Sequence, residues 1–61
     1  MKTYYIADIN GTIYAHDIKS EGKAFLILCD VIEQLMDENG LGLSEHDIHD
    51  LEIEILEEAY V

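Results

Sequence analysis

The chain has 61 residues, one cysteine and a formal net charge of −11, which comes from 14 acidic residues against three lysines. This length allows one domain at most, the single cysteine excludes an internal disulfide, and the charge disfavours nucleic acid and anionic membranes as partners. Because 49% of the residues are apolar, we expect a folded domain and not a disordered segment.

The first eight residues, MKTYYIAD, lack the long apolar region of a signal peptide. The longest apolar run, residues 24–29, is far shorter than the ~20 residues that cross a bilayer. We therefore expect a cytoplasmic protein, in a bacterial or phage-infected cell, that has no contact with membranes.

Residues 3–18 are expected to form a β-hairpin, because Tyr, Ile and Thr residues flank a central Asn10-Gly11. Two registers are compatible with this segment. One has a two-residue turn at Asn10-Gly11, and the other has a type I turn that starts at Asp8 and gives a three-residue loop with a bulge. The second register divides the side chains between two faces, with Tyr4, Ile6, Tyr14 and Ile18 on one and Tyr5, Ala7, Ile13 and Ala15 on the other.

A two-stranded ribbon is marginally stable by itself, so one face of the hairpin should pack on a helix. A helix is predicted over residues 20–38, with Ser20 as its N-cap and Asn39-Gly40 as its end. Cys29 lies in its apolar part and is interpreted as a core residue. The expected buried stripe consists of Phe25, Leu28, Ile32 and Leu35.

A second helix is predicted over residues 44–60, folded back antiparallel to the first, because the connector at residues 41–43 is short. Ser44 and Asp47 approximate a capping box at its start. Glu52 falls within its apolar sector, whose other members are Ile48, Leu51, Ile55, Leu56 and Ala59. The predicted fold is therefore α+β, a single domain over residues 1–61 in which a hairpin precedes two antiparallel helices (ββαα).

Asp8-Ile-Asn10-Gly11-Thr12 resembles the Asp-x-Asp-Gly-Thr motif of haloacid dehalogenase-like phosphatases. The resemblance implies a nucleophile at Asp8, but Asn10 replaces the second aspartate and cannot transfer a proton, and that family's sheet needs a longer chain. The same segment resembles part of an EF-hand calcium loop, in which the first ligand position falls on Ile6. We interpret the segment as a turn and predict a protein that is not an enzyme.

His46 and His49 are three residues apart, next to Asp50, which is a spacing that can hold zinc or nickel. A closed site needs a fourth ligand, and the local sequence supplies none. We therefore interpret both histidines as solvated, and predict no metal site and no cofactor.

The carboxylates of the second predicted helix follow a spacing of three and four residues, which places them in one acidic stripe opposite the apolar face. No lysine follows Lys23, so their mutual repulsion is uncompensated. A basic partner surface would explain such a stripe, and solubility is the alternative explanation. The predicted partner-binding residues are Asp47, Asp50, Glu54, Glu57 and Glu58, supported by Asp30, Glu33, Asp37 and Glu38.

In size and charge the chain resembles small acidic inhibitors made by bacteriophages and mobile elements, including DNA mimics and some anti-CRISPR proteins. The resemblance implies a protein that blocks a nucleic-acid-binding protein or nuclease complex by placing carboxylates where phosphates would bind. The alternative is a homo- or hetero-oligomeric adaptor, possible homodimers included, that uses the apolar hairpin face and the helix at residues 20–38. In that case the acidity serves solubility.

Overall fold

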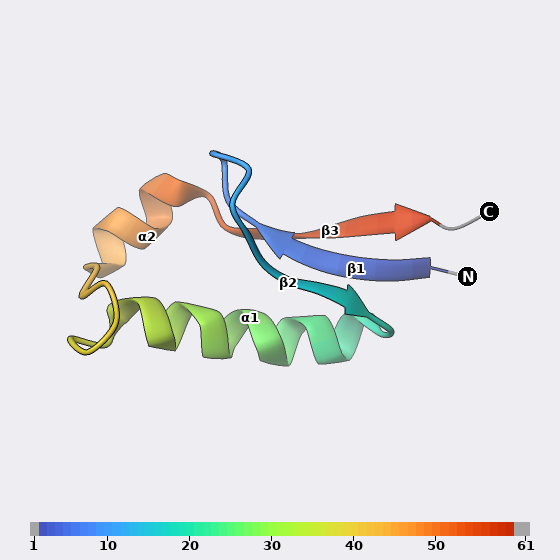
Figure 1. The fold of residues 1–61 in the computed structure, drawn as a ribbon, viewed down its shortest axis with the longest axis horizontal. Coiled ribbons are helices and arrows are strands. Elements are labelled where there is room, and N and C mark those ends of the chain that lie inside the picture. The colour runs from blue at the N-terminus through green and yellow to red at the C-terminus, as the bar shows by residue number, and fades with distance from the viewer. Residues whose placement is uncertain (1, 60–61) are drawn as a thin grey trace.

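The computed structural model describes residues 2–59, which form a three-stranded antiparallel sheet and two helices (Figure 1). The elements in chain order are β1 (Lys2–Ala7), β2 (Ile13–Ile18), α1 (Glu21–Met36), α2 (Glu45–Leu51) and β3 (Glu54–Ala59). The strand order is β2-β1-β3, so the first strand of the chain is the central one. α1 lies along one face of the sheet, which we call the covered face, and α2 lies at one end (Figure 1). We call the opposite face of the sheet the open face.

The predicted ββαα fold is wrong in the last third of the chain, because the elements run β-β-α-α-β. The predicted helix over residues 44–60 ends at Leu51, and residues 54–59 form β3; residue 60 lies outside the described residues. Glu52 adopts the left-handed conformation, with a φ of 50°, and so ends α2. Beyond it, Ile53 and Ile55 alternate with Glu52 and Glu54, which is the two-residue period of a strand.

The second helix is much shorter than the predicted helix over residues 44–60. α2 has only seven residues and leads the chain from the end of α1 back to the sheet (Figure 1). Its start is confirmed, because the Ser44 hydroxyl accepts a hydrogen bond from the Asp47 backbone N–H at 3.2 Å and the Asp47 carboxylate accepts one from the Ser44 backbone N–H. Ile48 is its buried residue.

The hairpin has the three-residue loop of the second register. The Gly11 N–H donates to the Asp8 carbonyl at 3.1 Å, and the Asp8 N–H donates to the Thr12 carbonyl at 3.1 Å. Gly11 has a φ of 85°, a conformation that glycine adopts without a steric penalty. Two further register shifts in the β1–β2 pairing place Ala15 opposite Ile6. Ala15 therefore packs on the covered face, against the prediction.

The core lies between the covered face of the sheet and α1. Its buried members are Ile6, Ile18 and Ala24, with Tyr4, Tyr14, Ala15, Ile27, Leu28, Ile53 and Ile55 packed around them. Ser20 caps α1 as predicted, because its hydroxyl accepts a hydrogen bond from the Lys23 N–H.

The buried stripe of α1 differs from the predicted one. Ala24 and Leu35 are buried, whereas Phe25 is 62% exposed and Cys29 is exposed. The small Ala24 side chain allows the start of α1 to approach the sheet closely, and this contact turns the neighbouring Phe25 away from the core.

Candidate protein-binding surface

The Asp8 carboxylate, the nucleophile position of the phosphatase-like motif, is occupied by hydrogen bonds within the hairpin. One oxygen accepts from the backbone N–H groups of Asn10 at 2.8 Å and Thr12 at 3.0 Å. The other oxygen accepts from the Tyr14 hydroxyl at 2.7 Å. Both oxygens thus hold the loop, which confirms the interpretation of this segment as a turn.

The hydrogen bond between Tyr14 and Asp8 makes the stability of the protein depend on pH in both the acidic and the alkaline range. The Tyr14 hydrogen bond lowers the pKa of Asp8 from its ordinary 3.8, and the same bond raises the pKa of Tyr14 from 10.0 to about 12. The contribution of Asp8 to stability is therefore present above pH 3.8 and lost as the pH falls through its lowered pKa. The contribution of Tyr14 is present below pH 10 and lost as the pH rises through about 12.

We expect Tyr14→Phe to lower the free energy of unfolding by about 1 kcal/mol at pH 7, a value reduced for the partial exposure of the hydroxyl. Urea denaturation of both proteins at pH 7 and pH 11.5 measures this difference, which should shrink at the higher pH. Tyr5→Phe is the matched control, because the structure gives the Tyr5 hydroxyl no hydrogen bond within residues 2–59. Equal losses in the two variants would contradict the role of the pair.

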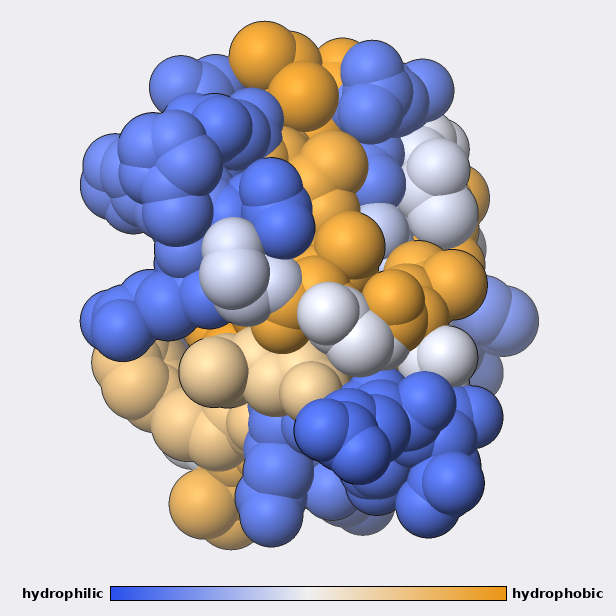
Figure 2. Space-filling model, turned by 90° about the vertical axis from the view of Figure 1, so that its left-hand side faces the viewer, coloured by the Kyte–Doolittle hydropathy of each residue, from blue (hydrophilic) through white to orange (hydrophobic). Residues whose placement is uncertain are grey.

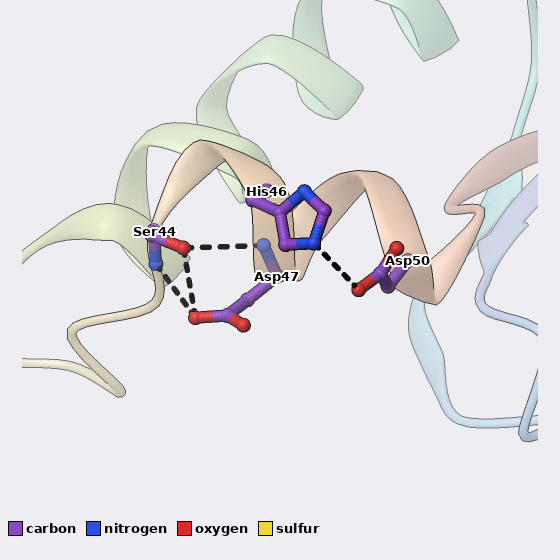
Figure 3. Close-up of polar contacts among 4 residues, drawn as sticks. All are labelled: Ser44, His46, Asp47 and Asp50. Atoms are coloured by element: carbon purple, nitrogen blue, oxygen red, sulfur yellow. Dashed lines mark hydrogen bonds and ion pairs between the residues drawn. The ribbon is translucent and has the colours of Figure 1, made fainter.

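His46 and His49 both lie on α2. His46 Nε2 lies 3.4 Å from Asp50 Oδ2, one turn further along α2 (Figure 3). Within residues 2–59 no three His, Cys, Asp or Glu side chains come together as a set of metal ligands.

The acidic stripe predicted on one helix is divided among three places in the structure. Asp47 and Asp50 lie on α2, where Asp47 closes the capping box and Asp50 pairs with His46 (Figure 3). The hydrogen bonds from Ser44 lower the pKa of Asp47. Asp47 therefore stabilises the start of α2.

The other three members of the stripe lie on β3 and point to both sides of the sheet. Glu54 and Glu58 are opposite Ala7 and Thr3 in the register, on the open face. Glu57 is opposite Tyr4, on the covered face, and its carboxylate lies 3.1 Å from Lys2 Nζ. This contact raises the pKa of Lys2. Within residues 2–59, β3 thus has two carboxylates without a basic partner on one face and one paired carboxylate on the other.

The four supporting residues predicted on the first helix lie in and just beyond α1. Asp30, Glu33 and Asp37 are separated by three and four residues and so lie along one line of the helix. Leu26, four residues before Asp30, is on the same line. Glu38 follows this line in the loop after α1. The last turn of α1 has no basic residue, although the negative end of a helix dipole favours one. We call these four carboxylates the α1 acidic line.

A second line of apolar side chains runs beside the α1 acidic line. Phe25, Cys29 and Met36 are related by four and seven residues, and Met36 is 44% exposed. Leu26, at the head of the acidic line, is 73% exposed. We call Phe25, Leu26, Cys29 and Met36 the exposed apolar line of α1. Both apolar sides of α1 can be read from the sequence. Only the packing on the sheet shows that the side with the exposed apolar line faces away from the core.

Apolar surface also reaches the end of the molecule that carries α2. Figure 2 shows this end, where a hydrophobic band runs between two hydrophilic flanks. The exposed large apolar residues of the loops include Leu41 and Ile9. Exposed apolar groups next to charged groups are typical of protein-binding surfaces.

An open hollow of about 300 Å³ lies on the sheet, lined by Tyr5, Ile13, His16, Glu57 and Glu58.

No protein-family model, curated protein or solved structure matches this chain. Over residues 2–59, no helix is both long and apolar enough to span a membrane. The surface of the molecule is therefore the basis for inferring its function.

Proposed function

We propose that the protein is a non-enzymatic binding protein that occupies the basic surface of a nucleic-acid-binding protein, as the DNA-mimic inhibitors of phages and mobile elements do. The exposed apolar line of α1 beside the α1 acidic line carries this proposal. Contacts of carboxylates with Lys or His side chains within residues 2–59 involve Glu57, Asp17 and Asp50, and none involves the α1 acidic line. Its charge is therefore free to attract a basic partner.

The two lines together have the composition of a binding surface. An apolar centre such as Phe25 and Leu26 contributes affinity through burial, and charged groups beside it contribute specificity and a fast encounter. The net charge of −11 extends this attraction beyond contact distance at low salt. A helix shaped for solubility alone would expose neither Phe25 nor Leu26.

A homodimer through α1 is the second candidate, and the exposure of Phe25 and Leu26 favours it. Two copies packed through this helix would also bring their acidic lines together, and each copy carries a charge of −11. Such repulsion weakens self-association, particularly at low salt. Sedimentation equilibrium at micromolar concentration separates the candidates, because a heteromeric binder is monomeric under these conditions.

We expect the double variant Asp30→Lys and Glu33→Lys to lose at least about tenfold in affinity for the natural partner. The partner is obtained by affinity capture from extract of the source cell, and binding is then measured with the purified protein from 50 to 300 mM salt, with duplex DNA as competitor. The proposal requires that the partner binds DNA, that DNA competes, and that affinity falls with salt.

The matched control is Glu45→Lys with Glu52→Lys, which changes the net charge equally at two exposed sites away from α1. This control should stay within about threefold of the parent protein, since distant surface charges act only through the overall field. If the two double variants lose affinity equally, or if neither changes it, the α1 surface is not the binding site.

A further inference from the structure

The two edges of the sheet differ in regularity. The pairing of β2 with β1 has two register shifts, and Asp17 in β2 has a φ of 56°. The pairing of β3 with β1 is unbroken over six residue pairs, from Lys2 with Ala59 to Ala7 with Glu54. Bulges and twists prevent a strand from accepting a neighbour, whereas a regular edge accepts one. The outer edge of β3 is therefore the edge that can be extended.

The register shows which backbone groups of β3 face outward. The Asp8 N–H bonds to Thr12 on the β2 side, and the Ile9 N–H bonds to Leu51 on the opposite side. Backbone groups alternate between the two sides of a strand, so Tyr5 and Ala7 direct theirs toward β3. The backbone groups of their partners Leu56 and Glu54 therefore point inward, toward β1. The N–H and C=O groups of Ile55 and Glu57 point outward, away from the sheet.

The side chains of β3 oppose one symmetric pairing with a second copy of the chain. The symmetric antiparallel arrangement that joins Ile55 to Glu57 of a second copy also sets Glu54 opposite Glu58, twice in each dimer. Like charges directly opposite each other destabilise a sheet. An added strand with basic residues opposite Glu54 and Glu58 would instead pair with two carboxylates. Its residue between these two would lie opposite Leu56.

We infer that the outer edge of β3 binds an extended, Lys- or Arg-containing segment of the basic partner, which joins the sheet as a fourth, antiparallel strand. The backbone of Ile55 and Glu57 supplies the hydrogen bonds, and the open face supplies the selection of side chains. The favoured pattern is basic-x-apolar-x-basic, because Glu54, Leu56 and Glu58 share that face. The charge of this partner rests on the proposed function, whereas the strand addition rests on the register.

The test uses the full chain and the synthetic peptide acetyl-TKTVTKT-amide, which has this pattern in both directions. Titration followed by amide ¹H–¹⁵N spectra measures the affinity. The decisive comparison is between two doubly N-methylated peptides of equal charge. One is methylated at the two threonines beside the valine, whose amides face Ile55 and Glu57 in the antiparallel strand, and the other at the two lysines, whose amides face away.

We expect methylation of the threonine amides to weaken binding at least about tenfold, and methylation of the lysine amides to change it less than about threefold. The Ile55 and Glu57 amides should exchange with solvent more slowly in the complex. Glu54→Gln with Glu58→Gln should weaken binding, and Asp30→Asn with Glu33→Gln should not. Absence of binding, equal binding of both methylated peptides, or loss only in the α1 variant would overturn the strand addition. None of these results determines the outcome of the α1 charge-reversal experiment. The strand addition at β3 and the proposed α1 binding surface can therefore fail independently.

Discussion

Ile6→Ala is expected to lower the free energy of unfolding by about 3–4 kcal/mol, the cost of truncating a fully buried aliphatic side chain. Ile6 is 0% exposed, lies on the central strand and belongs to the core cluster beneath α1. A domain of 61 residues has a total stability of roughly 3–9 kcal/mol, so a large fraction of the variant should be unfolded at 37 °C. Urea denaturation followed by far-UV circular dichroism measures the loss.

Ile9→Ala is the control for this experiment, because the same chemical change is made at a side chain that is 63% exposed. It should cost less than about 0.5 kcal/mol. Similar losses in the two variants would show that Ile6 does not lie at the centre of the core.

Ile53→Asp is expected to cost about 3 kcal/mol, because it places a carboxylate among apolar side chains that offer it no partner. Ile53, the residue before β3, packs against the core cluster. In the helix predicted over residues 44–60, the same residue would point away from Ile48 and Ile55, and the substitution would be harmless. The result therefore distinguishes the strand from the helix.

Glu54→Asp changes the next residue, whose side chain is exposed on the open face, and should shift the unfolding midpoint little. Thermal unfolding followed by circular dichroism compares both variants with the parent protein. A normal unfolding midpoint for Ile53→Asp would contradict the position of β3 in the sheet.

Local signals predicted the first part of the fold and failed in the last. Ser20 and Ser44 cap helices as expected, and Asp8 starts the turn, because each of these devices works within four residues. Residues 52–59 fit two periods at once. Ile55, Leu56 and Ala59 match a helix, and Glu52 to Ile55 alternate as in a strand. Residues 54–59 form a strand because they pair with β1, which is far away in the sequence.

The candidate surface was predictable as a list of carboxylates and not as an arrangement. Asp30, Glu33 and Asp37 share a line, because α1 exists as predicted. Glu57 and Glu58 were expected in one stripe and lie on opposite faces, since neighbouring residues of a strand alternate. Exposure of Phe25 depends on how closely Ala24 approaches the sheet, which is a property of tertiary packing.

The pairing of Lys2 with Ala59 has a consequence for how the protein folds during synthesis. The central strand β1 is translated before both of its neighbours, and β3 is translated after both helices. The sheet can therefore close only after residues 54–59 have left the ribosome, which makes its formation a late event that joins distant parts of the chain. Until then one side of β1 has no neighbour.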